Sequence, residues 1–117
     1  MVDASWRPPM LAQLFSVDEH LARLGADSWT YERKLDGLRC LAVRHGDTVE
    51  LWSRNHLSFT KRFPTVVAAL ERIDSRDFVI DGELVALIGE RTSFSVLQDS
   101  ASRTQPVLAA FDLLHLL

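Results

Sequence analysis

The chain has 117 residues, of which 47% are hydrophobic, so it can enclose the modest core of about one domain. Thirteen basic and sixteen acidic residues give a net charge of −3, which excludes a strongly basic nucleic-acid binder and leaves only local contacts with a polynucleotide. A single cysteine excludes an internal disulfide framework, and no apolar run reaches the roughly 18 residues that span a membrane. Since the first residues also lack a signal-peptide pattern, we expect a protein of the reducing cytoplasm with no membrane partner.

The first half of the chain predicts an extended lead-in, one helix and paired strands. Residues 1–15 form the lead-in, in which Trp6 is a packing residue that could also cover a cleft. Ser16 and Glu19 have the spacing of a capping box, whose side chains bond the free N–H groups of a first helical turn, and Gly25 can end that helix. Strands are expected over 31–34, 38–44 and 48–53, with a turn at 46–47.

The second half adds an amphipathic helix and two longer strands. Apolar side chains recur at helical spacing behind Pro64, which predicts a helix over 64–74 that packs against a sheet. Further elements are expected as a strand over 78–88, a turn at 89–90, a helix over 94–100 and a buried strand over 107–114. Because strands dominate and short turns join them, the predicted fold class is α+β, mainly an antiparallel sheet with few packing helices.

The most specific pattern is Lys34-x-Asp36-Gly37-x-Arg39, which lies on an expected strand and the turn after it. Alternate side chains of a strand share a face, so Glu32 and Lys34 would point to the same side. Gly37 lets the backbone turn or approach a ligand closely. Arg39 offers a planar fork of donors for a phosphate or ribose oxygen, so the segment suits a nucleotide.

Within this pattern Lys34 is a candidate nucleophile. A lysine amine attacks only when it is deprotonated, so its pKa must fall from about 10.4 through burial or through neighbouring cations such as Arg33 and Arg39. The alternative is a hairpin with surface charges, in which residues 36–37 are merely a turn and Lys34 is solvated.

Three later segments carry further candidates, each with a plain alternative. Arg54 follows a strand and could hold a phosphate, or it is only a polar strand end. Asp81 and Glu83 interrupt the apolar run 78–88, where carboxylates need partners. Glu83 could accept a ribose hydroxyl or help to coordinate Mg²⁺, and the alternative is a bulge or hairpin with paired acids. Phe111 could stack on a purine or belong to the core.

In this order, the segments resemble the nucleotidyltransferase (adenylation) domain of ATP-dependent DNA ligases, an ATP-grasp-like fold whose superfamily includes RNA ligases and messenger-RNA capping enzymes. The resemblance is greatest to the ligase domain of bacterial end-joining DNA ligases, and it covers almost the whole chain. It is carried by residues 7–12, 32–37, 53–55, 81–86, 93–94 with 97–98, and 111–116.

The resemblance implies a reaction and a role for each candidate residue. Lys34 would attack the α-phosphorus of ATP, release pyrophosphate and pass AMP to the 5′-phosphate of nicked double-stranded DNA, which the 3′-hydroxyl then attacks. ATP and Mg²⁺ (or Mn²⁺) are the implied cofactors. The implied roles are adenine recognition for Glu32, ribose and phosphate contacts for Arg39, ribose and metal contacts for Glu83, stacking on adenine for Phe111, the 5′-phosphate of the nick for Arg54, and structural support for Asp36, Gly37 and Asp81.

The resemblance also implies what the chain lacks. Residues 1–117 match only the N-terminal part of an adenylation domain, without the later metal-binding and phosphate-binding motifs or the OB-fold domain. Charge neutralisation at the phosphates would then be incomplete, so we expect the isolated chain to be weakly active or inactive unless the C-terminal half or end-joining proteins partner it. Residues 98–102 lack the basic stretch of the family, which weakens a DNA contact there.

The expected setting is the bacterial cytoplasm, in association with the nucleoid, and the expected processes are DNA repair and recombination by end joining. Two alternatives stay open. One is a noncatalytic nucleotide-binding or interaction module that kept the early motifs and lost the chemistry. The other is an RNA-capping guanylyltransferase, which the bacterial-ligase character of the flanking segments disfavours.

Overall fold

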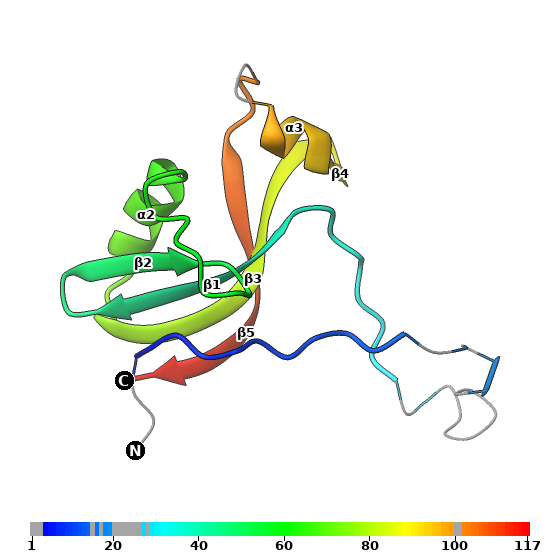
Figure 1. The fold of residues 1–117 in the computed structure, drawn as a ribbon, viewed down its shortest axis with the longest axis horizontal. Coiled ribbons are helices and arrows are strands. Elements are labelled where there is room, and N and C mark those ends of the chain that lie inside the picture. Colours follow the sequence, from blue (N-terminus) through cyan, green and yellow to red (C-terminus); the bar gives the residue numbers. More distant parts are fainter. Residues whose placement is uncertain (1–3, 15, 17, 20–26, 28, 100–101) are drawn as a thin grey trace.

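The computed structural model describes residues 4–14, 16, 18–19, 27, 29–99 and 102–117. Figure 1 shows one twisted antiparallel sheet with a helix against it and a long extended segment that leads into it. In this part of the chain the elements are β1 (Leu38–His45), β2 (Thr48–Trp52), α2 (Pro64–Glu71), β3 (Asp77–Ile88), β4 (Arg91–Thr92), α3 (Phe94–Gln98) and β5 (Pro106–Leu116). The predicted α+β class is confirmed.

Strand β3 lies at the centre of the sheet. It pairs with β1 along one edge and with β5 along the other, while β2 extends the sheet beyond β1 and β4 folds back on the end of β3. The register places Arg39 opposite Glu83 and Leu41 opposite Asp81. The β3–β5 pairing shifts register twice, the second time between Asp81 and Gly82, which is the bulge that the sequence offered as an alternative there.

One face of the sheet is covered by α2. This helix begins at Pro64, whose fixed φ suits the first turn, and buries Val66 and Leu70 against β-strand residues such as Leu51 and Phe78. The predicted end at residue 74 is wrong, because the helix ends at Glu71. The buried Arg44 of β1 caps this end of the chain segment, since its Nη1 donates to the carbonyls of Leu70, Glu71 and Ile73 at 3.3, 3.1 and 2.7 Å.

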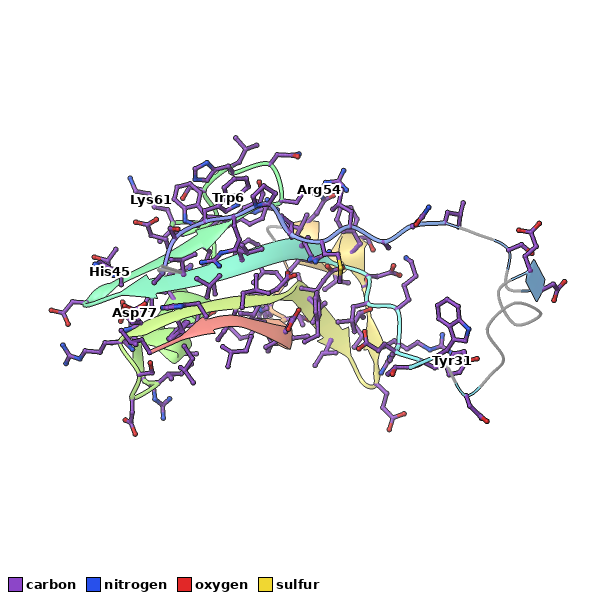
Figure 2. All side chains as sticks on the ribbon, turned by 90° about the horizontal axis from the view of Figure 1, so that it is seen from below. Trp6, Tyr31, His45, Arg54, Lys61 and Asp77 are labelled. Atoms are coloured by element: carbon purple, nitrogen blue, oxygen red, sulfur yellow. The ribbon has the colours of Figure 1, made fainter. Side chains whose placement is uncertain are left out.

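The opposite face is crossed by the lead-in, residues 4–14, which is extended as predicted and forms neither helix nor strand. A smaller cluster of buried residues lies here, with Leu41, Val43 and Val79 contacting Trp6 of the lead-in. Figure 2 shows Trp6 where this segment runs along the sheet. The two faces are therefore covered by different kinds of structure, a helix on one and an extended chain on the other.

Three expectations about elements need correction or lie outside the described residues. The strand over 31–34 is absent, because among the described residues the pairing of this part of the chain begins only at Leu38, opposite Leu84, and residues 31–34 join no strand ladder. Strand β5 is longer than predicted and none of its residues is buried. Of the helix expected from Ser16 to Gly25, only Asp18 and Glu19 are described as helical, and most of it lies outside the described residues.

The remaining predicted elements are confirmed with small shifts. Gly46 and Gly89 adopt positive φ in the two expected turns, at 63° and 61°. Helix α3 begins behind Ser93, whose hydroxyl accepts a bond from the N–H of Val96, and ends at Gln98 rather than at residue 100. No helix among the described residues is long and apolar enough to cross a membrane.

Candidate functional site

A pocket of about 750 Å³ lies where the lead-in, the lysine segment, the end of β2 and the middle of β3 meet. Its lining includes Lys34, Arg39, Arg54 and Glu83, which come from three separate segments of the sequence. The volume is in the range of ligand pockets, roughly 300 to 1,000 Å³. Three cationic side chains and one carboxylate make the lining basic in a chain of net charge −3. Such a lining suits a ligand of this size that carries phosphate.

Lys34 lies on a loop, and this loop is held in place by contacts with the β3–β4 hairpin. The N–H of Asp36 donates to Thr92 Oγ1 at 2.8 Å, and the guanidinium of Arg33 donates to the carbonyl of Glu90. Lys34 Nζ lies 3.5 Å from Asp36 Oδ1, and the Lys34 side chain is 90% exposed. Lys34 is therefore solvated in this structure, as in the plain alternative that the sequence left open, and Arg33 points to the hairpin turn.

Gly37 is required by the packing of the chain against β3. A Cβ at this position would lie 2.0 Å from the carbonyl oxygen of Leu84 and 2.9 Å from Val85 Cγ1. Any side chain would therefore push the start of β1 away from β3. The sequence had predicted that this glycine turns the chain or approaches a ligand, whereas the close approach found is to the neighbouring strand.

Arg39 is held in a fixed position by Asp81. Its Nε and Nη2 donate to the two carboxylate oxygens at 2.7 and 2.6 Å, and Asp81 is only 3% exposed. The hydrogen bond to Asp81 raises the pKa of Arg39 above its ordinary value, against the opposing effect of burial. Arg39 Nη2 also donates to the carbonyl of Met10 at 2.8 Å, so the guanidinium joins the lead-in to the sheet.

Phe111 lies beside this ion pair. The carbon at the centre of the Arg39 guanidinium is 5.1 Å from the Phe111 ring centroid, within the range of a cation–π contact. The residue is 45% exposed, so the alternative that it belongs to the core is wrong. A half-exposed ring that a cation holds in place can offer its open surface to a flat ligand.

Glu83 faces Arg39 across the β1–β3 pair and is partly buried. Burial raises the pKa of its carboxyl group, while a hydrogen bond from the backbone of Gly37 and the charges of Arg39 and Lys34 lower it. The described residues contain no group of three acidic, histidine or cysteine side chains that could hold a metal ion. Glu83 thus fits a partial site, since Mg²⁺ is commonly held by one or two carboxylates together with substrate phosphates and water.

Arg54 is exposed on the turn that follows β2. Ser53 holds this turn, because its hydroxyl accepts the N–H groups of Asn55 and Leu57 at 3.2 and 2.9 Å. Sequence reasoning did not assign this role to Ser53, although a serine directly after a strand is a recognised turn signal. Glu32, in contrast, is exposed and does not line the pocket, and the lining also leaves out Asp36, Asp81 and Phe111.

One contact of the lead-in was missed, and another was predicted only in part. Pairing of the Met10 carbonyl with Arg39 has no sequence signal, because any residue has a carbonyl group. Trp6 had been predicted to pack or to cover a cleft, and it lines a separate pocket of about 200 Å³ together with Trp52 and His56. A large aromatic residue in an otherwise extended segment was the available signal.

Comparison with known proteins decides the family. The family model described as the ATP dependent DNA ligase domain matches residues 9–116. The chain belongs to this family. The resemblance noted in the sequence is therefore confirmed, and the sheet described above is that of a ligase domain.

Individual relatives agree with the family. DNA ligase C of Mycobacterium tuberculosis is 39% identical over 74% of this chain and 27% of that protein. The multifunctional non-homologous end joining protein LigD of Mycobacterium bovis is 35% identical over 91% of this chain and 14% of that protein. A solved structure of mycobacterial DNA ligase D complexed with ATP and MES is 36% identical, with a TM-score of 0.65 over 73% of this chain and 29% of the other. The chain thus spans less than a third of each of these relatives.

Proposed function

We propose that this ligase-domain chain contributes the nucleotide-binding and nucleophile part of an ATP-dependent DNA ligase that seals nicks in double-stranded DNA. The observation that carries the proposal is the single pocket that gathers Lys34, Arg39, Arg54 and Glu83. The solved relative in complex with ATP supports the choice of nucleotide. The end-joining relative supports a role in DNA repair and recombination, which would place the protein with the bacterial nucleoid.

In the first step, Lys34 Nζ attacks the α-phosphorus of ATP. A nitrogen–phosphorus bond forms, the bond from the α-phosphorus to the bridging oxygen breaks, and pyrophosphate leaves with the electron pair. The amine must lose a proton, and Asp36, 3.5 Å from Nζ, is a carboxylate within reach of it. AMP is then transferred to the 5′-phosphate of the nick, and attack by the 3′-hydroxyl releases AMP and joins the strand.

The other side chains bind and orient the substrates. Glu83 would accept a ribose hydroxyl or hold Mg²⁺ or Mn²⁺, which supplies positive charge to the phosphates when it is bound. Arg39, already fixed by Asp81, would present its guanidinium to the ribose and phosphate end. Phe111 would stack on adenine. Glu32 would contribute to adenine recognition if the exposed loop that carries it closed toward the pocket.

We also propose that efficient catalysis needs further parts of the ligase. The pocket offers three cations for the charge of a triphosphate, and transition-state stabilisation in phosphoryl transfer depends on full neutralisation. Strand β5 also leaves the apolar side chains of Leu113 and Leu116 exposed, which another segment would cover. An OB-fold domain and the remainder of the adenylation domain, in the same polypeptide or in trans, are the proposed partners, together with end-joining proteins.

Covalent labelling tests the proposal. The chain is incubated with α-labelled ATP and Mg²⁺, alone and with the remaining ligase segments supplied in trans, and labelled protein is measured after denaturation. Label that disappears in Lys34→Ala is expected, because only a covalent bond to Nζ survives denaturation. Absence of label under both conditions would contradict the proposal.

A second candidate function is a noncatalytic nucleotide-binding module, which the 90% exposure of the Lys34 side chain favours. It predicts ATP binding that is equal in Lys34→Ala and in the unaltered chain, with no covalent label. Labelled GTP in the same assay tests the capping guanylyltransferase, which predicts label from GTP instead of ATP.

A further inference from the structure

The lead-in is fastened to the sheet at two points on either side of the buried Pro9. At Met10, the backbone carbonyl accepts a bond from Arg39 at 2.8 Å. At Trp6, the indole Nε1 donates to the carbonyl of Ser53 at 3.2 Å, and the ring stacks on His56 with centroids 4.2 Å apart and planes 12° from parallel. The same short segment therefore contacts a pocket residue and the turn that bears Arg54, whose position beside the lead-in is visible in Figure 2.

The turn after β2 needs this support. His56 has a φ of 64°, in the left-handed region that residues other than glycine rarely adopt, so its conformation must be stabilised by its surroundings. Its N–H donates to the carbonyl of Ser53 at 3.1 Å, the same carbonyl that Trp6 contacts. Trp52 lies against the His56 ring on a tilted plane, with centroids 4.5 Å apart. Aromatic contacts thus fix the residues on both sides of Arg54.

We infer that Trp6 is a positioning residue for Arg54, and that the lead-in sets the position of Arg54 relative to Arg39. The inference rests on the proposed function, in which Arg54 contacts the 5′-phosphate of the nick. A long exposed side chain loses conformational freedom when it binds a phosphate, and a turn held in one conformation lowers that cost. Removing Trp6 should therefore weaken recognition of the 5′-phosphate without changing any group that touches it.

The test compares the affinity of the 117-residue chain for two nicked duplexes that differ only in a 5′-phosphate or a 5′-hydroxyl at the nick. Arg54→Ala should reduce the preference for the phosphate roughly tenfold, as expected for one charge-assisted hydrogen bond. Trp6→Leu should reduce it at least threefold, and Trp6→Phe should reduce it less because the stack on His56 is retained. The double variant of Trp6→Leu with Arg54→Ala should lose no more than Arg54→Ala alone, since both act on one contact.

A matched control and a second readout separate positioning from damage to the fold. Leu14→Ala changes a fully exposed residue of the same lead-in and should leave the preference unchanged. Amide hydrogen exchange at His56 and Leu57 should be faster in Trp6→Leu than in the unaltered chain, while exchange in the paired strands β1 and β3 stays the same. If Trp6→Leu does not fold, Trp6→Phe carries the test through the same two measurements.

The inference and the proposed function fail in different ways. A Trp6→Leu variant with the full preference for the phosphate overturns the inference, as does an unaltered chain that binds both duplexes equally, whether or not Lys34 takes label from ATP. Loss of preference in Trp6→Leu supports the inference even where the unaltered chain takes no label from ATP, alone or with the remaining ligase segments supplied in trans, and that absence of label contradicts the proposed chemistry.

Discussion

The face of the sheet under α2 and the face under the lead-in differ in what holds them together. Under α2, fully buried apolar side chains such as Cys40, Leu51 and Phe78 pack into one cluster. Under the lead-in, three buried apolar residues are joined by polar contacts, of which the Arg39–Asp81 pair is the most buried. Burial of apolar area dominates folding stability, whereas directed hydrogen bonds fix side chains in place. The first face thus stabilises the fold, and the second positions the candidate site.

The largest expected effect lies on the α2 face. Phe78→Ala removes a side chain that is 1% exposed and leaves a cavity, so we expect the free energy of unfolding to fall by about 3 to 5 kcal/mol. Denaturant unfolding measures this loss. The matched control is Phe94→Ala on the partly exposed first turn of α3, which should lose far less. Equal losses in the two variants would contradict the assignment of the main core to this face.

On the lead-in face, Asp81→Ala should have the next largest effect. It leaves the Arg39 guanidinium, which is mostly buried, without its carboxylate partner. We therefore expect the free energy of unfolding to fall by about 2 kcal/mol. Labelling of Lys34 by ATP should also fall. Asp47→Ala breaks an exposed pair with Arg76 and should change stability by less than about 0.5 kcal/mol. If Asp81→Ala were as stable as the Asp47→Ala control but lost the label on Lys34, the Arg39–Asp81 pair would position the site without stabilising the fold.

The buried thiol of Cys40 gives the core face a pH dependence. Burial raises the pKa of Cys40 from 9.0 to about 12. The unfolded thiol therefore ionises first, so stability is full below pH 9 and is lost as the pH rises from 9 toward 12, by up to about 1.4 kcal/mol per unit. Unfolding of Cys40→Ala, compared with the unaltered chain across this range, measures the difference. Parallel pH profiles would show that the thiol is not shielded.

A small effect on stability is expected at Phe111. Because its ring is half-exposed, Phe111→Ala should cost less than about 1 kcal/mol of stability, but it should weaken ATP binding by roughly tenfold if the ring stacks on adenine. Leu116→Ala, exposed on the same strand, is the control and should leave ATP binding unchanged. Equal ATP affinity in all three proteins would remove Phe111 from the site.

Local sequence patterns predicted those helices and strands whose apolar residues recur at a regular spacing or which end at a glycine. The apolar run of β3 and the helical spacing behind Pro64 depend on residues close in sequence, and both elements were found. Residues 31–34 looked like a strand because their composition suits one, yet a strand also needs a partner strand, and in the described part of the chain none pairs with them. The end of α2 depended on Arg44, twenty or more residues before the carbonyls it caps.

The sequence predicted which residues belong to the candidate site better than it predicted their contacts. The resemblance to DNA ligases selected Lys34, Arg39, Arg54 and Glu83, which the structure brings to one pocket. Their partners were not predictable in the same way. The bidentate contact of Arg39 with Asp81 depends on the register of β1 against β3, and the contacts of the lead-in with the sheet have no local signal.

The open side of β5 bears on how this chain behaves in solution. In the described part of the protein β5 pairs only with β3, and Leu113 and Leu116 are exposed on it. An unpaired strand edge with apolar side chains is a template for pairing with the same edge of another molecule. Self-association should therefore rise with protein concentration. Binding and labelling of the chain should therefore be measured at protein concentrations at which light scattering shows it to be monomeric.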